Sequence, residues 1–238
     1  AKYCKQELES YYGVQVYMTR TTSTCPYPGT TSTDDNAKRV EYAKSVGADA
    51  YVSFHCDSSR NSGASGAKIF YPYANYNGNI GSQGAGLSQK ILDNLTSLGL
   101  NNHGILIRNS EDNTLYPDGS LADYLAVIKG NKYNNIPAVL IEHCFISNAS
   151  DCEQFLSSEE KLRTLGVADA NGIMDYLGLN NLKQASDGNW YFYKNGSVDY
   201  SYTGLALYSG NWWYVKNGKI DFNANTLAYF KGNWWYVR

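Results

Sequence analysis

The sequence carries little charge, little cysteine and no long apolar run, and each shortage excludes a class of protein. Charged residues make up 18% of the 238 positions, and the formal net charge is -2. That balance predicts neither a nucleic acid nor an acidic membrane surface as a partner. A transmembrane helix needs about 18 consecutive apolar residues. The sequence contains no such run, so no transmembrane segment is predicted.

Cysteine is too sparse for a small disulfide-held protein, and the five residues are Cys4, Cys25, Cys56, Cys144 and Cys152. Their number is odd, so at least one thiol stays unpaired within the chain. By contrast, 22 tyrosines, 22 glycines and five tryptophans are typical of an aromatic-rich surface protein and favour the cell exterior. The first residues lack the pattern of a signal peptide and look like the middle of an amphipathic helix. We therefore expect further residues upstream of Ala1.

Residues 1–178 alternate apolar strand-like runs with helix-period segments, a pattern that predicts an α/β domain. We expect a mixed, mostly parallel sheet flanked by helices. The expected strands are 14–19, 50–54, 68–73, 105–107 and 138–141. The expected helices are 34–46, 87–98 before Gly99, and 157–177 before Gly178, the last with a capping box of Ser157 and Glu160. Residues 25–33 have the composition of a loop.

After residue 187 the composition changes, and tryptophans recur every 22 residues at Trp190, Trp212 and Trp234. This is an internal repeat. Each aromatic strand is expected to pair with a second short strand across an Asn-Gly turn, at 195–196 and 217–218, because that turn needs positive φ at both positions. The third copy stops before its turn, so the natural protein is expected to continue. The predicted division is an α/β domain at 1–178, a linker at 179–187, and a small solenoid-like module of β-hairpin repeats at 188–238.

Two of the expected strands end in residues that can carry chemistry. "DAYVSFHCDSS" places His55, and "AVLIEHCFISN" places Glu142, at a carboxyl end, which is where open α/β sheets bind ligands. If the strands are neighbours, an imidazole and a carboxylate suit a metal site with an acid/base partner. The alternative is that both are satisfied polar residues, although burying a carboxylate without a partner is costly. His103 is expected in a loop and is a weak candidate for substrate contact.

Alternation along a strand limits what the neighbouring cysteines can do. It puts Cys144 on the face of Glu142 and His143 on the opposite face. His143 and Cys144 are therefore not expected to form a thiol-imidazole pair, and the same argument separates His55 from Cys56. A cysteine hydrolase would need the cross-strand pair of Cys144 with His55.

Four segments together resemble the zinc-dependent N-acetylmuramoyl-L-alanine amidases of the amidase_3 type. In order they are "VQVYMTRTT", "DDNAKRVEYAKSVGADAYVSFHCDSS", "GAKIFY" and "IPAVLIEHCFISNASDCEQFLSSEEKLRTLGVADANGIMDYL". The resemblance covers essentially all of residues 1–178, and its most specific parts are Ser-x-His at 53–55 and Glu-x-x-Phe-x-Ser-Asn at 142–148. It implies a catalytic domain, lacking its N-terminal part, that cuts the amide between N-acetylmuramic acid and L-alanine of the stem peptide in peptidoglycan.

In that family zinc is held by two histidines and a glutamate, and a further glutamate acts on the water. The resemblance makes His55 the second histidine ligand, Glu142 the catalytic glutamate and Zn²⁺ the cofactor. Cys144 stands where the family commonly has glycine. The family's first histidine, in a Gly-His-Gly motif, and its glutamate ligand have no counterpart here. Since a catalytic zinc normally needs three protein ligands, we expect the parent protein to be active and this chain to be inactive. The alternative is a non-catalytic wall-binding protein on a degenerate amidase scaffold.

The repeats resemble the cell-wall-binding repeats of Gram-positive surface proteins, which are related to choline-binding modules. Aromatic walls can hold a sugar face or a quaternary ammonium group. The rings expected to do so are Trp190, Tyr191, Trp212, Trp213, Tyr214, Trp234 and Trp235. The alternative is that half of them form the core of the module. The resemblance implies a secreted or wall-associated autolysin of a Gram-positive bacterium. Its partners would be peptidoglycan and a wall polymer, whether teichoic acid, choline or glycan.

Overall fold

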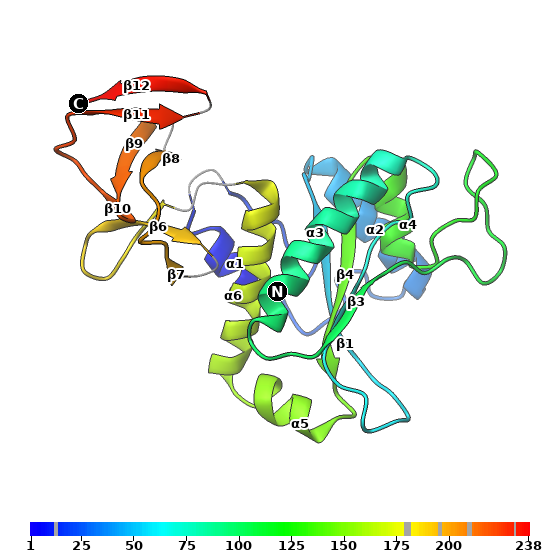
Figure 1. Cartoon of the computed structure of the whole chain (residues 1–238). Coiled ribbons are helices and arrows are strands. Elements are labelled where there is room, and N and C mark those ends of the chain that lie inside the picture. The colour runs from blue at the N-terminus through cyan, green and yellow to red at the C-terminus, as the bar shows by residue number, and fades with distance from the viewer. Residues whose placement is uncertain (12–13, 179–181, 195–196, 209–210, 231) are drawn as a thin grey trace. The chain divides into compact units, whose positions relative to one another are not determined.

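The structure of the chain is a computed structural model. It describes residues 1–11, 14–178, 182–194, 197–208, 211–230 and 232–238. The chain divides into two compact units, one of residues 17–162 and the other of residues 1–16 with 163–238. Figure 1 colours the chain from its first residue in blue to its last in red.

The unit of residues 17–162 contains a four-stranded sheet in the order β1-β4-β2-β3. The strands are β1 (Tyr51–Asp57), β2 (Ala67–Phe70), β3 (Asn102–Leu106) and β4 (Ala138–Phe145). β1 runs parallel to β4, and β2 runs parallel to β3, whereas β2 and β4 are antiparallel. The predicted α/β class with a mixed, mostly parallel sheet is confirmed.

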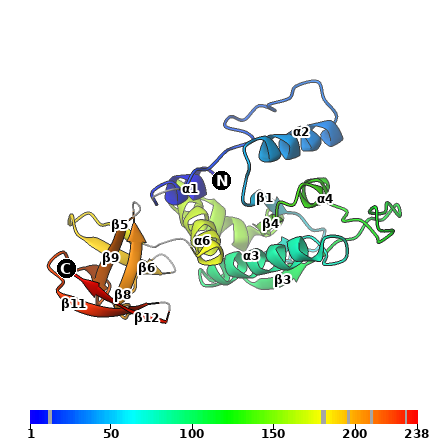
Figure 2. The ribbon, with the colours of Figure 1, turned by 90° about the horizontal axis from the view of Figure 1, so that it is seen from above.

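Helices cover both faces of this sheet. Figure 2 shows α2 (Ser32–Ser45) and α4 (Ala126–Tyr133) on one face and α3 (Gly78–Thr96) on the other. Leu140 of β4 packs with Val127 and Ile128 of α4. Because side chains alternate along a strand, the face of Leu140 is also the face of Glu142.

Both central strands run further than the sequence predicts. β1 continues to Asp57 and β4 continues to Phe145, so His55 and Glu142 lie within strands and not beyond their ends. The reason is that Glu142 has a strand on each side, with His55 as its partner in β1 and Lys68 as its partner in β2. β2 and β3 also differ from the predicted 68–73 and 105–107 by a few residues.

The predicted strand at 14–19 is wrong, because these residues are irregular. The backbone of Val16 bonds to side chains of the α1 segment (α1 is Lys2–Leu8) instead of to a strand. Lys5 Nζ donates to the carbonyl oxygen of Val16 at 2.7 Å, and the Val16 N–H donates to Glu9 Oε1 at 3.0 Å. These two bonds use the groups that a strand ladder would need.

The three predicted helices are present, with shifted ends. α2 begins after Thr31, whose side chain accepts from the N–H of Asp34. α5 (Ala149–Asp151) and the π-helical turn η1 (Cys152–Leu156) precede α6 (Glu159–Leu177). The capping box predicted with Ser157 and Glu160 is wrong, because Ser158 caps this helix and Lys161, three residues on, has no carboxylate to complete a box. Ser158 Oγ accepts from the N–H of Lys161 at 3.2 Å, whereas Ser157 Oγ donates to the carbonyl of Glu153.

The last part of the chain is built from short strands. They are β5 (Leu182–Gln184), β6 (Trp190–Lys194), β7 (Ser197–Val198), β8 (Gly204–Tyr208), β9 (Asn211–Lys216), β10 (Lys219–Ile220), β11 (Thr226–Phe230) and β12 (Asn233–Val237). Strands β5-β6-β10-β9-β8 form one sheet with β7 beside β6, and β11 pairs with β12. A core of Leu182, Ala206, Val215 and Ile220 lies among them.

The Asn-Gly turn predicted at 217–218 is confirmed. Asn217 and Gly218 have φ values of 50° and 76°, and they join the paired residues Lys216 and Lys219. These angles suit a two-residue hairpin of the type that Asn-Gly favours. The turn predicted at 195–196 lies outside the described residues, although Lys194 and Ser197 on either side of it are paired.

Candidate functional site

His55 and Glu142 lie side by side on neighbouring parallel strands. The register of β1 and β4 sets His55 opposite Glu142. Residues paired in this way project from the same face of a sheet, so the imidazole and the carboxylate share one face. The expectation that these two strands are neighbours is confirmed, and the pairing joins residues that are far apart in the sequence.

The register shifts immediately after this pair. The next partners are Asp57 and Phe145, so two residues of β4, His143 and Cys144, face the single residue Cys56 of β1. This irregularity is a β-bulge, which bends a strand and redirects its side chains.

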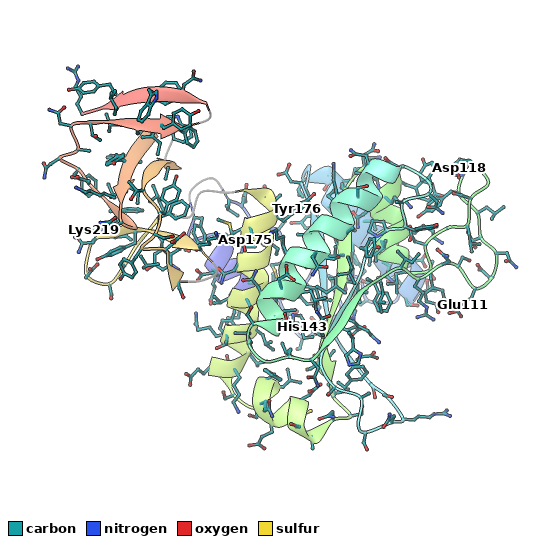
Figure 3. The ribbon with its side chains drawn as sticks, viewed as in Figure 1. Glu111, Asp118, His143, Asp175, Tyr176 and Lys219 are labelled. Carbon is teal, nitrogen blue, oxygen red and sulfur yellow. The ribbon has the colours of Figure 1, made fainter. Side chains whose placement is uncertain are left out.

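His143 holds the backbone of His55 from the opposite face of the sheet. Its Nδ1 donates to the carbonyl oxygen of His55 at 2.9 Å, since a carbonyl oxygen only accepts. Its ring stacks on Phe54, with centroids 5.7 Å apart. Figure 3 labels this buried residue. As predicted from strand alternation, His143 lies on the side of Phe54 and not on the face of Glu142.

Cys144 contacts Cys56 and not His55. The two sulfur atoms are 3.8 Å apart, whereas Nε2 of His55 lies 2.8 Å from Oγ of Ser53. The bulge interrupts the alternation on which the expected position of Cys144 rested. Within the described part of the chain, the pair of Cys144 and His55 that a cysteine hydrolase would need is not formed.

Glu142 is half-buried beside an ion pair. Lys68, its partner in β2, binds Asp57 with Nζ and Oδ2 2.5 Å apart. Oε2 of Glu142 is buried and has no hydrogen-bond partner among the described residues. Burial raises the pKa of Glu142, the charge of Asp57 raises it further, and Lys68 and His143 oppose both effects. A carboxylate in such a place is a stronger base than an exposed one.

The surroundings of His55 favour its neutral form. Desolvation among its neighbours lowers the pKa of His55, and the nearby His143 lowers it further. A neutral imidazole can bind a metal ion or accept a proton, whereas the protonated ring cannot. The contact with Ser53 Oγ orients the ring.

The residues that follow β4 fix the loop between β1 and β2. Ser147 Oγ accepts from the N–H of Ser59, and Asn148 Nδ2 donates to the carbonyl of Ser62, both at 2.9 Å. Oδ2 of the buried Asp151 accepts from the N–H groups of Gly66 and Phe145. The Ser-Asn end of the motif at 142–148 therefore positions the loop after His55.

Sequence reasoning missed Lys68 and Asp57 at this site. The only signal for Lys68 was a charged residue within the apolar strand "AKIF". His103 was expected in a loop, and this is wrong, because it belongs to β3. Its Nε2 donates to the carbonyl oxygen of Ser65 at 2.5 Å, and its ring lies edge-on to Phe145. These contacts give His103 a structural role.

A cavity of about 360 Å³ lies apart from the pair of His55 and Glu142. It is lined by Ser110, Glu111, Asp112, Asp123, Tyr124 and Lys129. Figure 3 shows Glu111 and Asp118 on the loop between β3 and α4, away from His143.

Among the described residues, no group of three or more His, Cys, Asp or Glu side chains could hold a metal ion. None of the helices described combines the length and apolar character needed to cross a membrane.

The aromatic residues of the repeats fall into two groups. Trp190 and Trp213 pack against the core of the module, and Tyr191 and Tyr214 are half-buried. Of the seven rings predicted to bind the wall, three are exposed, namely Trp212 at 47%, Trp234 at 67% and Trp235 at 51%. In β9 the adjacent Trp212 and Trp213 differ in exposure, as expected from alternation along a strand. In β12 the adjacent Trp234 and Trp235 are both exposed, so the expected alternation does not hold there.

Comparisons with known proteins identify both parts of the chain. Residues 1–175 match the family model of the N-acetylmuramoyl-L-alanine amidases, amidase_3 type. Residues 180–199, 201–221 and 223–238 each match the choline-binding repeat. The predicted internal repeat is therefore confirmed.

Individual relatives agree with these matches. An uncharacterized cell wall amidase of Bacillus anthracis is 31% identical over 159 residues, which cover 63% of this chain and 25% of the relative. The solved structure of Cwp6 from Clostridium difficile is 28% identical with a TM-score of 0.59, and covers 74% of this chain and 24% of Cwp6. The CwlD amidase from Clostridioides difficile, solved with the GerS lipoprotein, is 25% identical with a TM-score of 0.56, over 74% of this chain and 82% of CwlD. The chain thus spans about a quarter of the length of the first two relatives.

Proposed function

The chain belongs to the N-acetylmuramoyl-L-alanine amidase family, and we propose that it acts in hydrolysis of the amide between N-acetylmuramic acid and L-alanine in peptidoglycan. The observation that carries this proposal is the register pair of His55 and Glu142, in which a buried carboxylate oxygen has no partner within the described residues. An unpartnered buried carboxylate is costly to a fold unless it has another use.

Glu142 is the proposed general base. Its Oε2 takes a proton from a water molecule while the water oxygen attacks the carbonyl carbon of the amide. The same carboxyl group then donates that proton to the nitrogen of L-alanine as the carbon–nitrogen bond breaks. The raised pKa of Glu142 supports both steps, because it makes the carboxylate a better base and keeps the acid form accessible.

We propose Zn²⁺ as the cofactor of the active enzyme, with His55 as one ligand through its neutral imidazole. A catalytic zinc normally needs three protein ligands. The described residues do not fit that requirement, since they contain no group of three suitable side chains. No step above is therefore assigned to the metal.

The repeats are proposed to hold the protein at the cell wall of a Gram-positive bacterium. The matches to choline-binding repeats support this proposal, as do the exposed rings of Trp212, Trp234 and Trp235. Such rings bind a quaternary ammonium group or a sugar face. Trp190, Tyr191, Trp213 and Tyr214, which are less exposed, are proposed to complete these surfaces while also packing the module. The proposed domain division remains 1–178, 179–187 and 188–238.

A second candidate function is wall binding without catalysis. The absence of a three-ligand metal group among the described residues favours it. One experiment separates the two functions. Purified walls are incubated with the chain at saturating Zn²⁺, and both the bound protein and the newly released amino termini of L-alanine are measured.

Release of L-alanine amino termini that requires Zn²⁺ supports the amidase. Binding to the walls with no release supports the wall-binding protein and contradicts the proposed hydrolysis by this chain. Zinc content after dialysis, measured by atomic emission, shows separately whether the chain holds one equivalent of metal.

A further inference from the structure

Two thiols lie in contact at the bulge between β1 and β4. The sulfur atoms of Cys56 and Cys144 are 3.8 Å apart, and both cysteines are in the reduced form. The bulge creates this contact, because it places two residues of β4 opposite Cys56. A disulfide needs sulfur atoms about 2.05 Å apart and Cα atoms roughly 4.4–6.8 Å apart. Neighbouring strands lie about 4.8 Å apart, which falls within that range.

The two cysteines differ in access to solvent. Cys56 is exposed, whereas Cys144 is fully buried. The remaining cysteines are placed differently. Cys4 is buried and Cys25 exposed, each without a cysteine neighbour among the described contacts, and Cys152 directs its thiol to the carbonyl oxygen of Ile146 at 3.4 Å. A reagent in solution therefore reaches Cys56 and not Cys144.

We propose that Cys56 and Cys144 are a redox-active pair that forms a disulfide with a low-molecular-weight disulfide as oxidant. Cys56 is the attacking residue, because it is exposed, and Cys144 is the resolving residue, because it lies in contact with Cys56 but away from solvent. The bond would fasten β1 to β4 one residue after His55 and two residues after Glu142.

The reaction balances as two thiol–disulfide exchanges. The sulfur of Cys56 attacks one sulfur of the oxidant, so a mixed disulfide forms and one small thiol leaves. The sulfur of Cys144 then attacks the sulfur of Cys56 and displaces the second small thiol. Two protein thiols are oxidised to one disulfide, and the oxidant is reduced to two small thiols. The two protons of the protein thiols pass to the two small thiols that are released.

The test uses the full chain, reduced, freed of reductant and then incubated with oxidised glutathione. Remaining thiols are alkylated under denaturing conditions, and the protein is cut by a protease that cleaves before aspartate. Cleavage before Asp151 separates Cys144 from Cys152. We expect a linked pair of peptides containing Cys56 and Cys144, with Cys4 and Cys152 alkylated and with glutathione on the exposed Cys25, which has no cysteine neighbour to displace it. Because a cross-link restricts the unfolded chain, the oxidised form should melt higher by roughly 5 °C. Dithiothreitol should reverse both changes.

Variants separate the two roles. Cys56→Ser should leave Cys144 free and unmodified, because the exposed attacking thiol is absent. Cys144→Ser should leave glutathione attached to Cys56, because nothing resolves the mixed disulfide. Cys25→Ser is the matched control and should form the bond as the unchanged chain does.

Three results would overturn the proposal. Each is measured on the unchanged chain, so none depends on a variant that must fold. They are alkylation of both Cys56 and Cys144 after oxidation, a stable glutathione adduct on Cys56, and a bond from Cys144 to Cys152.

Discussion

The β1–β4 pair and the β9–β10 hairpin each consist of two strands, but the register of each is set by a different part of the structure. β9 and β10 are adjacent in the sequence, and the turn residues Asn217 and Gly218 set their register. β1 and β4 are far apart in the sequence, and their register breaks at a bulge directly beside His55 and Glu142. The hairpin is thus specified locally, whereas the candidate site depends on a pairing that only the whole fold establishes.

The two regions also differ in what their strands display. The strands of the repeats display both packed and exposed aromatic rings, which suits adhesion to a surface. The β1–β4 pair places charged and ionisable groups beside a buried carboxylate, which suits acid/base chemistry. Substitutions in each region should therefore change different measurements.

The largest effect is expected from Glu142→Gln. Removing the proposed base should lower the rate of L-alanine release from walls by about 10²–10⁴-fold, with binding to walls retained. The matched control is Glu41→Gln, on an exposed position of α2, which should keep the rate. A variant at Glu142 that released L-alanine at an undiminished rate would contradict the proposed role.

The same variant has a second measurement that does not depend on activity. Because the pKa of Glu142 is raised in the folded protein, the unfolded chain loses this proton first as pH rises above the usual value of 4.5. The folded state is therefore weakened as pH rises from there. In urea unfolding, the free energy of unfolding of Glu142→Gln minus that of the unchanged chain should be more positive at pH 7 than at pH 4. An equal difference at both pH values would show that burial of the carboxylate is not costly.

Adjacent tryptophans in β9 allow the next comparison. Trp213→Ala removes a ring that packs on the module core and should lower the free energy of unfolding by about 2–4 kcal/mol. Trp212→Ala removes a ring that is 47% exposed. This ring also lies 4.7 Å from that of Phe230, centroid to centroid. The loss of stability should therefore be about 1 kcal/mol, below that of Trp213→Ala, and wall binding should weaken by about 5-fold. Equal losses of stability in urea unfolding would contradict the separation of packed from exposed rings.

Two glycines test how strictly the hairpin turn is specified. Gly218 has φ of 76°, and an added Cβ would lie 2.6 Å from the carbonyl oxygen of Asp199. Gly218→Ala should therefore cost about 2–3 kcal/mol in unfolding free energy, from backbone strain plus the clash. Gly188 has φ of 78° with nothing near, so Gly188→Ala should cost only about 1 kcal/mol. Identical melting temperatures for the two variants would show that the clash is relieved.

The sequence predicts those features that depend on neighbouring residues. The hydrophobic periods of α2, α3 and α6, the 22-residue repeat and the Asn217-Gly218 turn all follow from local rules. The error at residues 14–19 has a physical cause, since the side chains of Lys5 and Glu9 bind the backbone of Val16. No period in the sequence reveals such competition.

The candidate site was predicted in part. Apolar runs that lead up to His55 and Glu142 predict both as candidate residues, and the structure pairs them in register. The bulge that turns Cys144 towards Cys56 has no signal in the sequence. Lys68 was also missed, because its position beside Glu142 depends on β2 pairing antiparallel to β4. Pairings between distant strands are decided by the packing of the whole sheet, and a single strand does not encode them.

A smaller effect than that of Gly218→Ala is expected from Lys68→Met, which keeps the length of the side chain but removes the partner of Asp57. The ion pair is partly exposed, so its loss should cost about 1–2 kcal/mol. Burial raises the pKa of Asp57, but the hydrogen bond and charge of Lys68, together with the N–H of Ser58, outweigh it and lower the pKa below its usual 3.8. A lowered carboxyl pKa stabilises the fold above the usual value and loses this effect as pH falls through the lowered one. The difference between Lys68→Met and the unchanged chain should therefore be present at pH 7 and shrink as the pH falls below 3.8 in thermal unfolding. The control is Lys38→Met, on an exposed position of α2, which should show no such pH dependence. If the difference persisted at low pH, Lys68 would act through its packing on Phe70 and Phe145 and not through its charge.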